Sequence, residues 1–322
     1  MAGRLCRTAS TVAVVIGALV IGSMAGPAWP YAPTTRFSTN DLEPTTPGRD
    51  GEAGALVFVK SAESLSDVFD RAGYRLDGVR RHGEVPRLFL ASLPRDLRQI
   101  RAPSHRKVMF IKTALPLILL VNERIVRDRM RLQILRTRIG AGVEIAADDA
   151  AWLTAITKRH GLARLDFDEL LCRVDIIPPS LALAQGAEET GWGTSRFARE
   201  GNALFGQRMF GGKGGLVPRR RDKGETFKVR AFEDLIEGVR AYAHNLNTFA
   251  AYEDFRRARE ALREAGRPLV GTELANTLGN YSERRQSYID TIQLIIRANA
   301  LGMFDKARLV EAVPRPVFSP DA

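Results

Sequence analysis

The stretch Val174–Phe210 reads VDIIPPSLALAQGAEETGWGTSRFAREGNALFGQRMF. Two adjacent prolines followed by Ser180 predict that a helix begins here, because proline cannot continue a preceding helix and serine is a favoured N-cap. The residues after Ser180 are mostly apolar and small, which indicates a helix that is buried on most sides. Polar side chains enter this helix at Gln185 and at the acid pair Glu188-Glu189, just before the sequence Gly-Trp-Gly.

The two acids of the pair lie on different faces of the predicted helix. Gln185 and Glu189 are four residues apart and share one face, whereas Glu188 lies about 100° away from Glu189 around the helix. At the C-terminal end of an apolar helix, the helix dipole and the low local polarity both raise the pKa of a carboxyl group. A raised pKa suits a general acid at neutral pH. The alternative is that both glutamates are solvated charges, which is the usual state of a Glu-Glu pair.

Two segments form a longer motif, namely LAQGAEETGWG at Leu183–Gly193 and NALFG at Asn202–Gly206. Together they resemble the glucosaminidase domain of bacterial peptidoglycan hydrolases, of the mannosyl-glycoprotein endo-β-N-acetylglucosaminidase type. The basic run between them and the upstream segments resemble the Bax branch of that family. Gly186 departs from the pattern, because the family has alanine there. The family's catalytic acid is the glutamate directly before the Ser/Thr, which corresponds to Glu189.

The resemblance covers about residues 166–301 and implies a mainly α (α+β) fold. A lysozyme-like helical domain would carry Glu189, with a small β-hairpin lobe opposite and an N-terminal helical extension. The implied reaction is hydrolysis of the β-1,4 bond after N-acetylglucosamine in peptidoglycan glycan strands. Glu189 would protonate the leaving oxygen, while a second carboxylate or the acetamido group of the substrate supports the oxocarbenium-like centre.

The resemblance leaves the second carboxylate open. In relatives a glutamate on the hairpin activates water, and the hairpin expected here offers Asp222 and Glu225. Glu225 is the better candidate because it directly precedes the expected strand at 227–232, and substrate assistance is the alternative. Tyr281 matches the family's active-site tyrosine with one residue inserted. The other interpretation of Tyr281 is packing under the last helix.

Four further residues of the motif are candidates for substrate binding: Gln185, Trp192, Asn202 and Phe205. Trp192 and Phe205 have rings that could stack on a sugar or form a cleft wall, and packing in the core is the alternative for each. Asn202 is expected to be a buried amide that fixes the loop after the helix.

The amino-acid composition limits the classes of molecule that the protein is expected to bind. The chain of 322 residues carries 48 Lys plus Arg against 37 Asp plus Glu, a net charge of +11 that favours anionic partners. Four scattered histidines and two cysteines lack metal-ligand spacing, so we expect no metal and no cofactor. Nucleic-acid binding would rest on charge alone, and the export signal described next argues against it.

The N-terminus has the pattern of an export signal at 1–32. Arg4 and Arg7 precede the apolar run Val12–Ile21, and Ser23-Met24-Ala25 is a small-x-small cleavage site. The uncharged length is also compatible with a retained anchor in the inner membrane, so cleavage and retention both stay open. We therefore expect a periplasmic or cell-envelope location.

The remaining chain divides into four parts. Residues 33–53 form a disordered linker, 54–150 an N-terminal helical region packing on the hydrolase core, 151–302 the glucosaminidase domain, and 303–322 a flexible tail. The strongest helix outside the motif is Val108–Leu135, apolar at first and then rich in arginine. Pro116 should kink this helix or mark its start. Its arginines predict a solvated face, and the alternative is a patch that binds an anionic polymer.

Two other functions remain open at this stage. A lytic transglycosylase of similar fold also uses one glutamate without a second acid, although Gly-Trp-Gly after Glu189-Thr190 departs from the usual pattern of that class. A non-catalytic cell-wall-binding scaffold would keep the helix and lack a working second acid.

Overall fold

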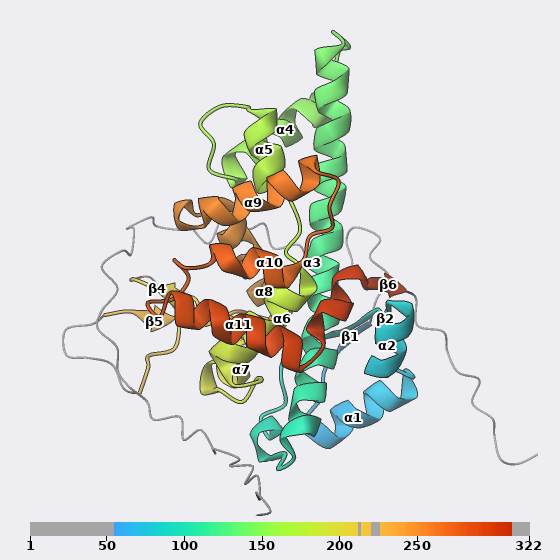
Figure 1. The fold of residues 1–322 in the computed structure, drawn as a ribbon, viewed down its shortest axis with the longest axis vertical. Helices are drawn as coiled ribbons and strands as arrows, with labels where there is room; N and C mark the ends of the chain where they lie inside the picture. The colour runs from blue at the N-terminus through green and yellow to red at the C-terminus, as the bar shows by residue number, and fades with distance from the viewer. Residues whose placement is uncertain (1–54, 212–213, 220–225, 311–322) are drawn as a thin grey trace, which may run out of the picture.

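The computed structural model describes residues 55–211, 214–219 and 226–310, and it is mainly helical (Figure 1). The α-helices are α1 (Ala62–Arg71), α2 (Leu76–His82), α3 (Pro103–Gly140), α4 (Ala147–Arg159), α5 (Phe167–Arg173), α6 (Pro179–Thr190), α7 (Arg196–Gly201), α8 (Leu235–Thr248), α9 (Glu253–Glu264), α10 (Gly271–Leu274) and α11 (Gln286–Ala298). The 3₁₀ helices are η2 (Leu97–Gln99), η3 (Ala250–Tyr252), η4 (Ala275–Thr277) and η5 (Leu301–Lys306). The predicted fold class, a mainly α lysozyme-like arrangement, is confirmed.

The described strands form three short pairs. They are β1 (Ala55–Val57) with β3 (Leu88–Leu90), β2 (Glu84–Pro86) with β6 (Arg308–Val310), and β4 (Arg208–Met209) with β5 (Lys228–Val229). The first two pairs are parallel, and the β4–β5 pair is antiparallel with Arg208 opposite Val229. The β4–β5 pair lies where the sequence predicted a hairpin, although the regular strand is shorter than the expected 227–232.

Helix α6 lies at the centre of the fold, packed against α3, α10, α11 and η5 (Figure 1). All its residues from Pro179 to Ala187 are buried. A helix in this position must be narrow as well as apolar, and Gly186 shows why. A Cβ atom added to Gly186 would lie 3.2 Å from the ring of Phe110 on α3. The close approach of α3 thus accounts for glycine where the resembling family has alanine.

Helix α3 runs the length of the described molecule, and its C-terminal half extends beyond the central body (Figure 1). Its buried first half, Met109–Asn122, packs on α6 and α8, so the predicted central buried helix is confirmed. The helix begins at Pro103 and continues through Pro116, which therefore does not mark its start.

The arginines in the second half of α3 are not all a solvated face, so that prediction was wrong in part. Arg129 donates hydrogen bonds to the carbonyls of Leu171 and Val174. Two others pair with acids of neighbouring helices, namely Arg131 with Asp149 at 2.7 Å and Arg136 with Asp168 at 2.7 Å. These contacts attach α4 and α5 to the projecting end of α3.

A buried ion cluster holds the segment that leads into α6. Asp175 is 2% exposed and accepts two hydrogen bonds from Arg263, at 2.8 and 3.0 Å. Burial alone would raise the pKa of Asp175, but the hydrogen bonds from Arg263 and the charges of Arg259 and Arg129 outweigh it and lower the pKa. Arg259 also donates to the backbone carbonyl of Asp175. The start of α6 is thereby tied to α9.

The C-terminal part of the chain differs from the predicted tail. Residues up to 310 form η5 and β6, and the carboxylate of Asp305 accepts hydrogen bonds from the backbone and hydroxyl of Ser180 at 2.8 Å each. Helix α6 starts two residues earlier than predicted, with Pro178 as its N-cap in place of Ser180, so Ser180 lies in the first turn. Its free backbone N–H therefore needs an outside acceptor, which Asp305 supplies.

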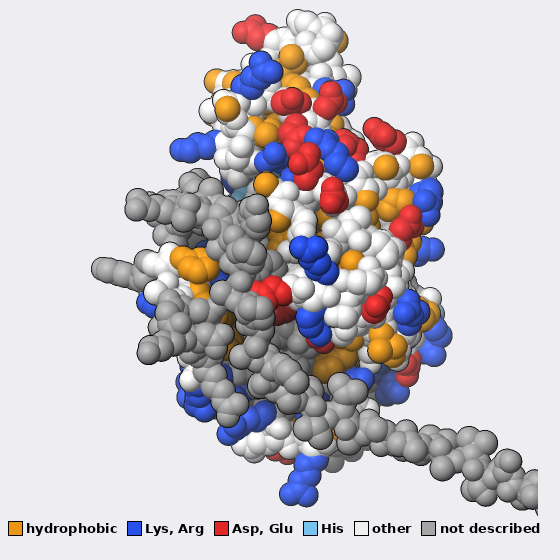
Figure 2. Space-filling view, turned by 60° about the vertical axis from the view of Figure 1, so that its left-hand side comes forward, with side chains coloured by type: hydrophobic (Ala, Val, Ile, Leu, Met, Phe, Trp, Pro, Cys, Tyr) orange, Lys and Arg blue, Asp and Glu red, His pale blue; other side chains and the backbone are white. Residues whose placement is uncertain are grey.

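The export signal predicted at 1–32, the linker at 33–53 and the part of the predicted tail at 311–322 lie outside the residues that the structure describes. Within the described ranges, none of the helices combines the length and the apolar character that crossing a bilayer requires. Lysine and arginine side chains are spread over the face in Figure 2, and acidic side chains are interleaved with them in its upper part.

Replacing Asp305 with alanine should lower the free energy of unfolding by about 1–3 kcal/mol, because the buried N–H groups of Ser180 and Gly271 would lose their acceptor. Urea unfolding followed by circular dichroism measures the change. Asp290→Ala is the matched control, since Asp290 is exposed on α11 and accepts from Gln286. We expect that control to change stability by less than about 0.5 kcal/mol. Equal losses in both variants would contradict the capping role.

Candidate active site

Glu189 lies in the last turn of α6, where the helix ends at Gly191 with a left-handed φ of 56°. The loop Asn202–Gly206 passes directly over its carboxyl group. A Cβ atom added to Gly206 would lie 3.3 Å from Glu189 Oε2, and Gly206 has a φ of +59°. Both the close approach and the left-handed backbone favour glycine at this position. The two segments of the sequence motif therefore meet at the carboxyl group of Glu189.

The pKa of Glu189 is raised from 4.5 to about 7. Burial of the carboxyl group is the largest cause, followed by the negative charge of Glu188, whereas Arg284, Arg208 and the hydroxyl of Tyr288 lower the pKa. The residue as a whole is exposed to solvent. Desolvation acts at the ionising atoms, which have Gly206 and the polar groups named here around them, so exposure of the residue and a raised pKa are compatible.

The sequence correctly predicted the direction of this shift. The predicted causes were the end of the helix dipole and low local polarity, and the structure adds a neighbouring charge. Glu188 is half-buried and forms an ion pair with Arg284 at 2.6 Å, so its charge is paired as well as partly solvated. Sequence reasoning missed Arg284, which lies in the turn before α11 and has no motif of its own.

Four tyrosines lie within electrostatic range of Glu189, and the negative charge of Glu189 raises the pKa of each of them. They are Tyr242 on α8, Tyr252 on η3, Tyr281, and Tyr288 on α11. Tyr281 stacks on Tyr288 with ring centroids 5.4 Å apart, and its ring lies 5.8 Å from that of Tyr252. Burial is the largest cause of the raised pKa in all four, so these hydroxyls stay protonated and can donate hydrogen bonds.

Tyr281 fits both of its sequence interpretations. Its ring is half-buried and packs on Tyr288 at the start of the last α-helix, as the packing alternative required. The same position brings it into the electrostatic range of Glu189, as the resemblance implied. A direct contact with substrate remains a prediction.

The structure places Gln185 in the interior, with no exposed surface. Its side-chain amide donates to the hydroxyl of Tyr288 at 3.0 Å, and its carbonyl accepts from the hydroxyl of Tyr242 at 2.6 Å. Phe205 is also buried and stacks on Tyr242 with ring centroids 3.7 Å apart. Gln185 and Phe205 therefore hold Tyr242 and Tyr288 in place from the interior of the protein.

The other two candidate residues of the motif, Trp192 and Asn202, contact neighbouring segments of the chain. Trp192 packs edge-on against Phe110 of α3, with ring centroids 5.8 Å apart, and Lys107 lies 5.0 Å above its ring. Asn202 is buried and its amide donates to the carbonyls of Phe232 and Glu233, at 3.2 and 3.0 Å. Asn202 thus fixes the loop after α7, in the way that the sequence predicted.

The two candidates for the second carboxylate, Asp222 and Glu225, lie at 220–225, outside the described residues. The described base of the hairpin is close to the site, because the charge of Arg208 on β4 acts on Glu189. No group of three or more His, Cys, Asp or Glu side chains that could hold a metal ion occurs among the residues that the structure describes.

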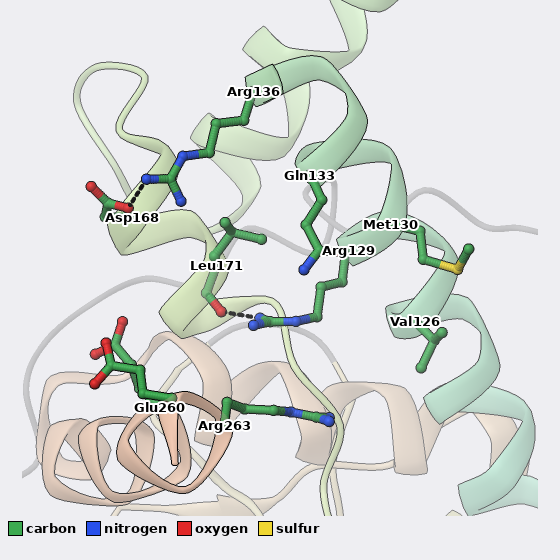
Figure 3. A pocket seen from close by; sticks show the side chains of 10 residues that line it. Val126, Arg129, Met130, Gln133, Arg136, Asp168, Leu171, Glu260 and Arg263 are labelled. Atoms are coloured by element: carbon green, nitrogen blue, oxygen red, sulfur yellow. Dashed lines mark hydrogen bonds and ion pairs between the residues drawn. The ribbon is translucent and has the colours of Figure 1, made fainter. Parts of the chain in front are cut away.

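A separate hollow of about 540 Å³ lies between α3, α5 and α9 (Figure 3). None of the residues that line it belongs to the motif. Its arginines are already engaged, since Arg129 binds Leu171, Arg136 pairs with Asp168, and Arg263 binds Asp175 outside the hollow. The surroundings of Glu189 are therefore the candidate active site, and this hollow is not.

The ion pair beside Glu189 gives two variants with opposite effects. Glu188→Gln should lower the pKa of Glu189, because it removes a negative charge and frees Arg284, while Arg284→Gln should raise it, each by about 0.5–1 pH unit. Titration of the ¹³C-labelled Glu189 carboxyl by NMR measures both. Glu200→Gln, which breaks an exposed Arg196 pair on α7, is the control and should leave the pKa unchanged. Shifts of the same sign in the first two variants would refute the assignment.

Comparison with known proteins agrees with this geometry. The glucosaminidase family, described as mannosyl-glycoprotein endo-β-N-acetylglucosaminidase, matches residues 166–301. The chain is 35% identical over 204 residues to Protein bax of Escherichia coli (strain K12), which covers 62% of this chain and 71% of that protein. No solved structure matches. The chain therefore belongs to the Bax-type proteins that carry a glucosaminidase domain.

Proposed function

We propose that this protein is an exported peptidoglycan hydrolase. It acts as an endo-β-N-acetylglucosaminidase that cleaves the β-1,4 bond after N-acetylglucosamine in glycan strands, with Glu189 as the general acid. The observation that carries the proposal is a glutamate that is exposed as a residue, has a desolvated carboxyl group with a pKa of about 7, and lies in the motif of a glycosidase family. At that pKa a large fraction of the group is protonated at neutral pH and can protonate a leaving oxygen.

The charged and polar groups around Glu189 favour proton transfer from its carboxyl group to the glycosidic oxygen. When Glu189 gives its proton to the glycosidic oxygen, it becomes an anion, which Arg284, Arg208 and the Tyr288 hydroxyl stabilise. The departing sugar leaves an oxocarbenium-like centre that needs a second negative or nucleophilic group. In this proposal Glu225 supplies it, with Asp222 or the acetamido group of the substrate as alternatives. Tyr281, whose ring is half-buried, would face the bound sugar.

Export belongs to the same proposal and rests on the signal pattern at 1–32. The expected site of action is the periplasm or cell envelope, where peptidoglycan is found. Cleavage of the signal and retention as an inner-membrane anchor are the two forms that export could take.

Glu189→Gln should reduce the release of fragments from purified sacculi by about 10²-fold or more, because the amide cannot donate a proton in the same way. Mass spectrometry of the muropeptides, with the full-length chain, measures this loss. The parent should generate new reducing N-acetylglucosamine ends. Glu200→Gln is the control, because Glu200 is exposed and pairs with Arg196 on α7.

The products also separate the alternatives. Anhydro ends in the parent digest would identify a lytic transglycosylase instead of a hydrolase. Sacculus binding without any released fragments, in both the parent and Glu189→Gln, would identify a non-catalytic scaffold. Full activity of Glu189→Gln would refute the role of this carboxyl group.

A further inference from the structure

The segment between β3 and α3 exposes three arginines at a repeat of three residues. Arg95, Arg98 and Arg101 are exposed, whereas Leu97 is fully buried and Ile100 is half-buried. The segment contains the 3₁₀ helix η2, in which side chains three residues apart lie on the same side, and the burial pattern continues this repeat on either side of η2. The three guanidinium groups therefore project from one side of the segment. We call Arg95, Arg98 and Arg101 the arginine row.

The backbone that carries the arginine row is held by three helices. Asp96 accepts a hydrogen bond from the backbone N–H of Ala62, the first residue of α1, at 2.9 Å. Arg199 on α7 donates to the carbonyl of Arg95 at 3.0 Å, and Arg106 on α3 donates to the C-cap carbonyl of η2 at 3.1 Å. Because the segment is already fixed, little conformational entropy of its backbone would be lost when the row binds a ligand.

The charge of the arginine row is not neutralised by the acids close to it. Its three arginines form no ion pair with any acid in the described parts of the chain. Asp96 lies in the same segment but is directed to α1, and Glu200 on α7 pairs with Arg196 at 3.3 Å. The arginines in the second half of α3 differ, since Arg131 and Arg136 each pair with an acid of a neighbouring helix. The row therefore presents a net positive charge that attracts anions.

The arginine row lies beside the turn that follows Glu189. A Cβ atom added to Gly193 would lie 3.2 Å from Leu97 Cδ2, so η2 packs directly on this turn. Arg199, which binds the backbone of the row, also donates to the carbonyl of Thr194 at 3.1 Å. In Figure 2, lysine and arginine side chains gather at the lower left of the face, where acidic side chains are few. A long polymer bound at Glu189 therefore has a basic surface close to it.

We propose that the arginine row binds the carboxylates of the peptides that are attached along the glycan strand, and so directs the protein to strands that carry peptides. The inference rests on the proposed function, because it takes peptidoglycan as the polymer. The N-acetylated sugars of the strand are uncharged, and the free carboxylates belong to the peptides. Guanidinium groups bind carboxylates through charge-assisted hydrogen bonds. Because the peptides repeat along the strand, several arginines can bind carboxylates at the same time.

The test compares binding to intact sacculi, by co-sedimentation, with binding to glycan strands from which an amidase has removed the peptides, by calorimetry. Each protein is the full-length chain with Glu189→Gln, so that strands are not cut during the measurement. Arg95→Gln with Arg98→Gln and Arg101→Gln should bind sacculi about 10-fold more weakly, because three exposed charge interactions are lost. Its binding to bare strands should equal that of the parent. The corresponding lysine substitutions keep the charge and should retain most of the affinity.

The matched control removes three exposed arginines from other parts of the fold. Arg71→Gln with Arg164→Gln and Arg297→Gln lowers the net charge by the same amount, and these residues lie on α1, between α4 and α5, and on α11. This control should bind sacculi as the parent does. Circular dichroism of each variant checks that the fold is intact.

Four results would refute the inference. They are parent-like binding of the glutamine variant to sacculi, an equal loss in the control, an equal loss on bare strands, and a loss in the lysine variant as large as in the glutamine variant. Vesicles of phosphatidylglycerol and phosphatidylcholine test a lipid surface as the partner. If the glutamine substitutions weaken binding to these vesicles but not to sacculi, the row belongs to a lipid-binding surface and the inference is wrong.

Muropeptide release by the chain with its native Glu189 separates this inference from the proposed function. If that chain releases fragments and Glu189→Gln does not, yet the arginine row has no effect on binding, the inference is refuted and the hydrolase stands. If no fragments are released but sacculus binding depends on the row as expected, the row stands as a wall-binding site and the hydrolase is refuted.

Discussion

Glu189 can hold a proton near neutral pH because its carboxyl group lies at the end of α6, a helix that is buried from Pro179 to Ala187. The helix is enclosed by α3, α10, α11 and η5, and its last turn, with Glu188 half-buried and Glu189 exposed, brings the carboxyl group from this interior to the surface. Burial is the largest cause of the raised pKa. The small residues of α6 are part of the same constraint, because a Cβ atom at Gly186 would press on Phe110.

An enclosed helix of this kind needs polar contacts at its start. Ser180 donates to Asp305 from η5, and the segment before α6 is held by Asp175 with its arginines from α3 and α9. Asp305 lies far from the motif in sequence, and Asp175, which directly precedes α6, is held by arginines that lie far from it. The N-terminal region contributes as well, since α3 forms one wall of α6 and β2 pairs with β6. Helix α6 is therefore fixed by parts of the chain on both sides of the family domain.

The sequence was informative where the relevant contacts are local. Helix α6, the position of Glu189 at its end and the amide role of Asn202 follow from spacing and capping within one short stretch. The groups that lower the pKa of Glu189 come from distant parts of the chain. Tyr288 bonds to Gln185 across 103 residues of sequence, and Arg284 pairs with Glu188 across 96. Tyr288 is the first of the regularly spaced apolar residues of α11, and this spacing does not indicate which residue Tyr288 will contact. The predicted tail failed for the same reason, since Asp305 acquires its role only through Ser180.

The pKa of Glu189 results from opposing contributions of several elements. Burial and Glu188 raise it, and Arg284, Arg208 and Tyr288 lower it. A strongly raised pKa would leave an acid too weak to protonate a leaving group, whereas an ordinary one would leave it ionised at neutral pH. Tyr288 and the two arginines thus limit the effect of burial on the pKa of Glu189. Because these groups lie on β4 and around α11, the acidity of a residue on α6 depends on how the rest of the domain packs around it.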